Sequence, residues 1–288
     1  MIAGVDRREG EARFARRGRA RAWGWLRSVA SIARTMGSYT LARRPEGVRN
    51  GVRALQALAR EVGSSLRGGP AERRCPICGW SGPRFAPAYY FDRYQDDIRC
   101  WGCGSTDRCR MLALFVHDDL GSFFAERRRR VLDIGPMLYS RAFFPDDVDY
   151  VSFDLRPGVA TVQGDLCVAP FADQSFDAWL CFHVLDLIPD DRAAMRELFR
   201  ILAPGGVGLL DHVMNWSGPT EEYAAPRKDD NDHIRRYGSD LPDRLRALGF
   251  DLTVVDTTEV FDEATRRRHG IQPRRFLICR RPSLDAAA

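Results

Sequence analysis

The sequence of 288 residues has no long apolar run. A helix that crosses a bilayer needs about 18 or more consecutive apolar residues, and no such stretch occurs, so no transmembrane segment is predicted. The first residues mix arginines with acids and lack the apolar core of about 7–15 residues that marks a secretory signal. These absences exclude a membrane-spanning protein and favour a cytoplasmic one.

Cysteine is scarce outside one short region. Five of the eight cysteines fall between residues 75 and 109. Clustered cysteines without a secretory signal indicate a metal site in a reducing compartment better than they indicate disulfides. With 44% apolar and 10% aromatic residues, the chain can bury one full α/β core and still leave about 120 residues for other parts.

The net positive charge of the chain comes from its N-terminal part. Residues 1–74 hold 17 arginines and 6 acids, a net charge of +11. Because the whole chain has a net charge of +5, residues 75–288 carry a net charge of −6. Apolar residues recur there at helical spacing, which predicts two amphipathic helices. The first face comprises Ala22, Trp25, Val29, Ile32, Ala33 and Met36, and the second comprises Val48, Val52, Leu55, Ala59 and Val62.

This basic helical arm has three candidate partners. It can pack on the catalytic domain or a partner subunit, make peripheral contact with an anionic membrane surface, or bind nucleic acid. No aromatic RNA-reading motif accompanies the arginines, so nucleic acid is not favoured. A linker, 63–70, rich in glycine and serine, ends the arm.

Two CxxC hooks follow the linker. Cys75 and Cys78 form the first, and Cys100 and Cys103 form the second after 21 intervening residues. This spacing is typical of a structural Zn²⁺ site in which four thiolates fill the coordination sphere. The alternatives are four unrelated buried thiols, or a site in which Cys109 replaces a hook cysteine. Cys109 is otherwise expected to begin a helix whose apolar residues pack on the sheet described next.

The central stretch, 131–211, alternates strands and helices. One apolar strand ends at Asp133-Ile134-Gly135, a second ends at Asp154, and a third precedes Gly164. The spacing is that of a βαβ nucleotide-binding unit, in which an acidic side chain after the second strand accepts ribose hydroxyls. A buried strand over 176–183, a helix over 190–203, a stop at 204–206 and a strand over 207–211 continue the pattern. The sequence therefore predicts a doubly wound α/β sheet that is mostly parallel.

These residues resemble the class I S-adenosylmethionine-dependent methyltransferases. The strings that carry the resemblance are VLDIGP at 131–136, SFDL at 152–155, QGDL at 163–166 and FDAWLCFHVLDLIPDDRAAMRELFRILAPGG at 176–206. The first string departs from the family, because Met137 and Tyr139 stand where glycines are usual. The string Cys-Gly-Ser-x-x-Arg-x-Arg, which starts at Cys103, further resembles a bacterial subgroup with a zinc-ribbon-like knuckle. Together the resemblances cover roughly 73–280.

The resemblance implies a seven-stranded Rossmann-like sheet, with strands 251–257 and 274–280 at its final antiparallel edge. It divides the chain into a basic helical arm and linker (1–70), a zinc knuckle (71–110), a methyltransferase domain (111–282) and a tail (283–288). It also implies that S-adenosylmethionine binds at the carboxyl ends of the strands. The implied donor-site residues are Asp133 and Gly135 for the amino-acid tail, Asp154 and Leu155 for the ribose, Asp165 and Leu166 for the adenine, and Phe182 and His183.

Acceptor chemistry is expected after the fifth strand. Residues 213–231 read as a long polar loop, and the following segment matches the subgroup's Asp-His-x-Arg-x-Tyr-Gly string. His233 is the candidate general base, since a hydroxyl acceptor needs a proton acceptor and histidine titrates near neutral pH. Its alternative is a structural role in fastening the loop. Arg235, Arg236 and Tyr237 can hold an anionic or sugar-like acceptor, or face water.

Three functions remain open. The first is O-methylation of a small molecule or glycan. The second is RNA methylation, in which the zinc knuckle and the basic arm would grip phosphates and binding would weaken steeply with salt. The third is a non-catalytic scaffold whose glycine-poor first turn no longer binds the donor.

Overall fold

The computed structural model describes residues 56, 59–60, 71–90, 93–137, 139–212, 214–227 and 232–283. The first predicted arm helix, all but three residues of the second, the linker and nearly all of the tail lie outside these residues. The chain divides into two compact units: Met1–Ser122 with Ala142–Phe144 and Phe261–Gln272, and Phe123–Arg141 with Pro145–Val260 and Pro273–Ala288. Each unit is described by itself. No helix in the described part of the chain is long and apolar enough to cross a bilayer.

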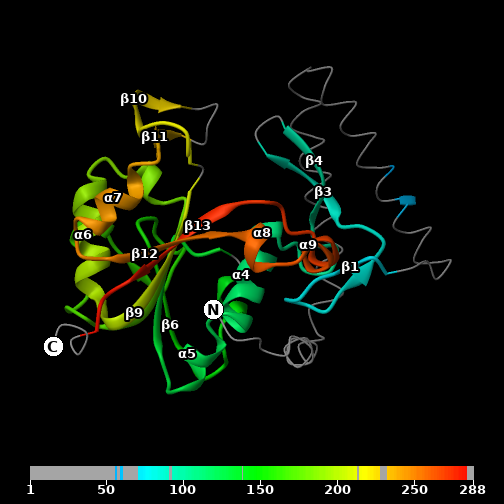
Figure 1. Cartoon of the computed structure of the whole chain (residues 1–288), viewed down its shortest axis with the longest axis horizontal. Helices are drawn as coiled ribbons and strands as arrows, with labels where there is room; N and C mark the ends of the chain where they lie inside the picture. Colours follow the sequence, from blue (N-terminus) through cyan, green and yellow to red (C-terminus); the bar gives the residue numbers. More distant parts are fainter. Residues whose placement is uncertain are drawn as a thin grey trace. The chain divides into compact units, whose positions relative to one another are not determined.

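The second unit is built on a seven-stranded sheet (Figure 1). Its strands are β5 (Arg130–Ile134), β6 (Asp149–Asp154), β7 (Val162–Gln163), β8 (Phe176–Phe182), β9 (Leu202–Asp211), β12 (Asp251–Asp256) and β13 (Arg275–Arg280). Their order is β12-β13-β9-β8-β5-β6-β7. β13 is antiparallel to both of its neighbours, and every other pairing is parallel. This architecture confirms the predicted Rossmann-like fold. The antiparallel strand lies second from the edge, however, because β13 inserts between β12 and β9.

The connections among the first three strands differ from the predicted βαβ unit. Between β5 and β6 the structure has a 3₁₀ helix, η2 (Ser140–Phe143), in place of a full α-helix. A second 3₁₀ helix, η3 (Leu166–Val168), follows β7. Pro136 and Pro145 flank η2 and lack the backbone N–H that a longer helix would need. The first crossover is therefore short.

Helix α6 (Asp191–Ile201) supplies much of the apolar core of the second unit. Asp190 caps it by accepting a hydrogen bond from the backbone N–H of Ala193 at 2.9 Å. Its buried apolar residues join one cluster with those of α7 (Leu241–Arg246), and the two helices lie side by side in Figure 1. β9 begins directly after α6, so the Pro-Gly-Gly stretch predicted as a stop is already part of the strand. The helix nevertheless ends close to the predicted position.

Neighbouring strands β8 and β9 pack unusually closely at one pair of residues. Trp179 pairs with Gly208, and a Cβ at position 208 would lie 2.2 Å from the indole ring. The Trp179 indole N–H donates to the carbonyl oxygen of Leu198 in α6 at 3.1 Å. Glycine at 208 therefore makes room for the tryptophan that joins the sheet to its covering helix.

A two-stranded sheet replaces much of the predicted loop, 213–231. β10 (Glu221–Arg227) pairs with β11 (His233–Arg236) in antiparallel register, and Glu222 faces Arg235 across the pair. Opposite charges at facing positions favour such a pairing. Because the residues are polar, the sequence pattern predicts a loop and not a strand pair. Asp240 directly precedes α7, where its side chain could cap the helix, but its carboxylate accepts from the backbone N–H and hydroxyl of Thr220 and does not cap it.

The first unit joins small strands to two helices. The strands are β1 (Arg73–Arg74), β2 (Ser81–Gly82), β3 (Ala86–Tyr90) and β4 (Arg93–Arg99), in two antiparallel pairs. Helix α4 (Asp107–Asp118) begins next to Cys109 as expected, and it packs against α9 (Glu263–His269). The remaining short helices are α5 (Gly121–Ala125), whose residues are divided between the two units, and η4 (Leu185–Leu187) and α8 (Thr257–Val260), which belong to the second unit.

Candidate functional site

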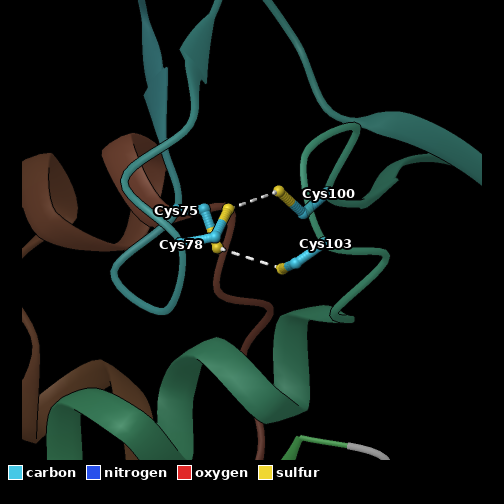
Figure 2. Close-up of side chains that lie close together, drawn as sticks. All are labelled: Cys75, Cys78, Cys100 and Cys103. Atoms are coloured by element: carbon cyan, nitrogen blue, oxygen red, sulfur yellow. Dashed lines mark hydrogen bonds between the residues drawn. The ribbon is translucent and has the colours of Figure 1, made fainter. Parts of the chain in front are cut away.

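The four hook cysteines converge in the first unit (Figure 2). The Sγ atoms of Cys75 and Cys103 are 3.8 Å apart, and those of Cys78 and Cys100 are 3.7 Å apart. Four sulfurs bound tetrahedrally to Zn²⁺ at about 2.3 Å lie about 3.8 Å from one another. The spacing therefore fits a tetrahedral thiolate site. Burial raises the pKa of the Cys100 thiol, so a cation held by the thiolate has to displace a proton.

Two backbone turns aim these sulfurs. In each hook the first cysteine's carbonyl oxygen accepts from a glycine N–H, from Gly79 at 3.0 Å and from Gly104 at 2.7 Å. Both glycines have positive φ, 72° and 81°, a conformation that side-chain-bearing residues adopt at a cost. Cys109 lies outside the convergent group and contacts the Thr106 hydroxyl in the first turn of α4. The sulfur set is thus the one formed by the two hooks.

Sequence reasoning did not single out Arg110, which joins the knuckle to α9. Its side chain is fully buried, and its guanidinium donates to the carbonyl oxygens of Ile98 at 2.8 Å, Ser105 at 2.9 Å and Gly270 at 3.2 Å. The guanidinium also stacks on Phe85, 3.7 Å from the ring centroid. A fully buried arginine that donates to several carbonyl oxygens stabilises the packing of the segments that carry them.

In the second unit, the acids predicted for the methyl donor follow or end adjacent parallel strands. Asp133 lies in β5, Asp154 ends β6, and Asp165 comes two residues after β7. Because the carboxyl ends of parallel strands meet at one sheet edge, this is the edge where ligands bind in open α/β folds. Phe182 is buried at the end of the next strand, β8.

Asp133 is almost completely buried, and it accepts a hydrogen bond from the Tyr150 hydroxyl. Burial raises the pKa of Asp133 to about 6, although the Tyr150 hydrogen bond opposes the shift. Gly135 follows with φ +64°, and a Cβ there would lie 2.6 Å from a methyl group of Val184. The turn after it is closed by Ser140, whose hydroxyl bonds to both the N–H and the carbonyl of Met137. Serine hydrogen bonds thus hold a turn that has few glycines.

Asp154 is engaged by Arg156. The backbone N–H and the Nε of Arg156 donate to Oδ1 at 2.8 and 3.0 Å, and its Nη2 donates to Oδ2 at 2.9 Å. These bonds, the side-chain ones above all, lower the pKa of Asp154. A carboxylate has about four acceptor positions, so one position on Oδ2 stays open to a further donor. The carboxylate can therefore still accept a hydroxyl of the ribose diol. Leu155 beside it is exposed.

Asp165 and Leu166 form the start of η3. The Asp165 carboxylate accepts from the backbone N–H of Cys167 at 2.8 Å, which fixes the side chain, and Leu166 is buried in the core. With Asp133 and Asp154, this gives three fixed carboxylates near one sheet edge. Their chemistry fits a ligand that presents an ammonium group, a diol and an exocyclic amine.

Three histidines surround one carboxylate beyond the ends of β8 and β9. Asp186 Oδ2 lies 3.4 Å from His212 Nδ1, 3.8 Å from His183 Nδ1 and 3.3 Å from His233 Nε2. Asp186, His212 and His233 are buried, whereas the side chain of His183 is 25% exposed. Burial raises the pKa of Asp186, but the imidazoles of His183 and His212 outweigh it and hold the pKa well below its usual range. Asp186 is thus a buried anion.

Arg235 and Tyr237 do not face water. Arg235 is buried and donates to the carbonyl oxygens of Leu185 and Pro189, at 2.9 and 3.0 Å. The Tyr237 hydroxyl donates to Asp191 at 2.8 Å. Both side chains therefore anchor the segment around β11 to η4 and the start of α6. Their partners are already within the protein, so they are poor candidates for holding an acceptor.

Comparison with known proteins agrees with this architecture. The family model described as "Methyltransferase domain" matches residues 102–210. An uncharacterized methyltransferase of Mycobacterium sp. strain KMS is 31% identical over 141 residues, which are 43% of this chain and 54% of that protein. A demethylmenaquinone methyltransferase of Renibacterium salmoninarum is 32% identical over 130 residues, 41% of this chain and 51% of that protein. These matches support a methyltransferase. The chain spans about half the length of these curated relatives.

Among solved structures, the chain is similar to the 1,6-didemethyltoxoflavin-N1-methyltransferase of Burkholderia thailandensis, which was solved with 1,6-didemethyltoxoflavin and S-adenosylhomocysteine. The identity is 19%, the TM-score is 0.43, and the alignment covers 61% of this chain and 78% of that one.

Two members of the histidine cluster of the second unit, Asp186 and His212, were not predicted as site residues. His183 and His212 each come directly after a strand, and the strands, β8 and β9, are parallel neighbours paired at Phe182 and Asp211. A rule that tests every polar residue one position past a predicted strand would have found His212 but not Asp186, which lies in η4.

Proposed function

We propose that this protein is an S-adenosylmethionine-dependent methyltransferase that acts on a hydroxyl group of a small molecule or glycan. The observation that supports it most is the set of acids at the ends of three adjacent parallel strands, in a seven-stranded sheet that is mostly parallel. S-adenosylmethionine would supply a methyl group already activated by a sulfonium cation. The protein would then have to bind the donor, orient the acceptor and exclude water.

The donor would be held by side chains fixed before it arrives. Asp154 would accept a ribose hydroxyl at its open Oδ2 position, and Asp165 would accept the adenine amine. Asp133 would face the ammonium of the amino-acid tail, where the missing side chain of Gly135 leaves the backbone accessible. Leu155, Leu166, Phe182 and His183 would complete the surroundings of the adenosine. Because each carboxylate is already fixed, binding of the donor costs less side-chain conformational entropy.

His233 is the residue that we assign to the acceptor's proton. It is buried at the start of β11, with Nε2 3.3 Å from the buried anion Asp186. A carboxylate at this distance orients an imidazole and stabilises the cation that forms when it takes a proton. Arg235 and Tyr237 would hold β11 in place, which gives this histidine a fixed position.

Zinc is the cation that we assign to the four hook cysteines, with a structural role. Four thiolates would fill its coordination, so the ion would have no open position for a water or a substrate. It would stabilise the first unit, which the two hooks, α4 and α9 build together.

Calorimetric titration of the full chain with S-adenosylmethionine and with S-adenosylhomocysteine tests the donor assignment. Both should bind at one site per chain. Absence of binding by a folded chain would contradict the proposal and favour a non-catalytic scaffold. Transfer of a radiolabelled methyl group to a panel of phenols and sugars, with RNA as a separate arm, then tests the acceptor class. Labelling of RNA alone would overturn the assignment to a small molecule or glycan.

The role of His233 is tested by separating binding from turnover. His233→Ala should keep the donor affinity and lower turnover by about 10²–10⁴-fold, the range for loss of a general base. His117→Ala is the matched control, because His117 also lies beside a carboxylate, that of Asp118, but in the first unit. The control should keep turnover within a few-fold. Full turnover in His233→Ala would show that another group serves the acceptor.

A further inference from the structure

The strongest unassigned feature of the molecule is the group formed by His183, Asp186 and His212. One ligand atom from each, two imidazole nitrogens and a carboxylate oxygen, lies within 4.8 Å of the other two. Two histidines and one carboxylate form a donor set that proteins use for divalent transition metals. The three residues belong to the second unit and share no ligand with the four-cysteine site.

Three buried polar atoms of Asp186 and His212 lack hydrogen-bond partners. In the described structure neither ring nitrogen of His212 makes a hydrogen bond, although the residue is 5% exposed, and Asp186 Oδ1 also has none. A buried donor or acceptor left without a partner costs about 1–3 kcal/mol, so such atoms are uncommon in folded proteins. Their presence on two adjoining side chains indicates that something else satisfies them.

The distances within the group suit a cation better than direct hydrogen bonds. Asp186 Oδ2 lies 3.4 Å from His212 Nδ1 and 3.8 Å from His183 Nδ1, whereas hydrogen bonds of this kind are about 2.7–3.2 Å long. Ligands bound at about 2.0–2.2 Å in a tetrahedral arrangement lie about 3.3–3.6 Å apart. Small side-chain shifts would therefore bring all three atoms to one cation.

The backbone positions the two histidines for this purpose. His183 adopts φ +53°, which is unusual for a residue with a side chain, and its N–H donates to the carbonyl of Asp211 at 2.9 Å. His212 directly follows Asp211. The ends of β8 and β9 thus hold both imidazoles against η4, which carries Asp186.

We propose that His183, Asp186 and His212 bind one divalent transition-metal cation. Three protein ligands leave at least one coordination position open, and the partly exposed His183 lies on the accessible side. The open position would take a water. It would take an oxygen of the acceptor if the proposed methyl transfer is correct, and only this second role rests on the proposed function. His233, against the same carboxylate, would orient Asp186 from behind.

Cobalt binding to the full chain, purified with its knuckle metal and without donor or acceptor, tests the site. Co²⁺ followed by calorimetry and visible absorption should give about one further equivalent, with d–d bands that lack thiolate charge-transfer absorption. His212→Gln and the less buried His183→Gln should each weaken this binding at least about tenfold. His117→Gln, the histidine beside Asp118, should leave it unchanged.

The fold of each variant is checked by circular dichroism, which should match the unmutated chain. Titration of His212→Gln with S-adenosylhomocysteine should also match it, and this donor titration reports separately on the proposed function. The site is overturned if the unmutated chain binds no Co²⁺ beyond that which exchanges into the cysteines. It is equally overturned if folded His183→Gln and His212→Gln bind Co²⁺ as tightly as the unmutated chain.

Discussion

Arg156 holds Asp154 through three hydrogen bonds, from its backbone N–H, Nε and Nη2. The carboxylate is buried, but 71% of the arginine side chain is exposed, so breaking its side-chain hydrogen bonds to Asp154 costs little free energy. The ribose that we assign to Asp154 would therefore share this carboxylate with the arginine. Substitutions in the pair probe the proposed donor site directly.

Replacement of either partner should change donor affinity in opposite directions. Asp154→Ala should weaken S-adenosylmethionine by about 1–3 kcal/mol, the cost of losing a hydrogen bond to a charged group. Arg156→Ala should tighten it by a few-fold, because the two hydrogen bonds from the arginine side chain are lost, although the backbone N–H at 156 would still donate to Oδ1. Calorimetric titration measures both. Unchanged affinity in Asp154→Ala would mean that the ribose binds elsewhere.

Asp133 should make stability depend on pH. Its pKa is raised from 3.8 to about 6, so the folded state holds its proton more tightly than the unfolded state does. The contribution is fully present below about pH 4 and is lost as the pH rises through about 6, a difference of about 3 kcal/mol. Urea unfolding at several pH values should therefore show that Asp133→Asn flattens the decline in stability over this interval.

The control for this measurement is Asp149→Asn, an exposed acid at the opposite end of the neighbouring strand β6. It should keep the slope of the unmutated protein. Equal slopes for the unmutated protein and Asp133→Asn would show that Asp133 ionises as readily in the folded chain as in the unfolded one.

Loss of the cation from the hooks should destabilise the protein. Cys75→Ser or Cys100→Ser should reduce the zinc content by about one ion per chain, and thermal unfolding should occur at a lower temperature, because metal binding is coupled to folding. Metal analysis measures the first effect and calorimetry the second. Cys109→Ser, outside the convergent group, should retain the zinc. Protein prepared without chelators that contains no zinc would contradict the assignment.

Arg110→Lys should destabilise the first unit by about 2–4 kcal/mol, since a lysine cannot reach the same carbonyl oxygens and its charge would be buried without its partners. Arg267→Lys is the control, because the Arg267 side chain is exposed and pairs with the exposed Glu72. It should change the free energy of unfolding by less than about 0.5 kcal/mol. Similar effects of both substitutions in urea unfolding would refute the fastening role of Arg110.

The sheet could be predicted from sequence because its strands are short apolar runs that end in acids or glycines at regular intervals. The cysteine quartet could be predicted because each hook is local and its spacing reflects the geometry of one metal. The group around Asp186 could not, since His183 and His212 are brought together only by the register of β8 on β9. The β10–β11 pair was missed because its stabilising contacts are between charges, which read as loop composition.

The first unit is discontinuous in the chain, and this bears on the order in which the protein is made. Arg110 donates to the carbonyls of His269 and Gly270, and a ring nitrogen of His269 lies 2.8 Å from the carbonyl oxygen of Arg74. A ribosome releases residues 71–118 long before it synthesises 261–272. Arg110 would therefore lack two of its four carbonyl acceptors until almost the whole polypeptide has emerged. Folding intermediates during translation should thus be most exposed to thiol oxidation and to chaperones at this end of the protein.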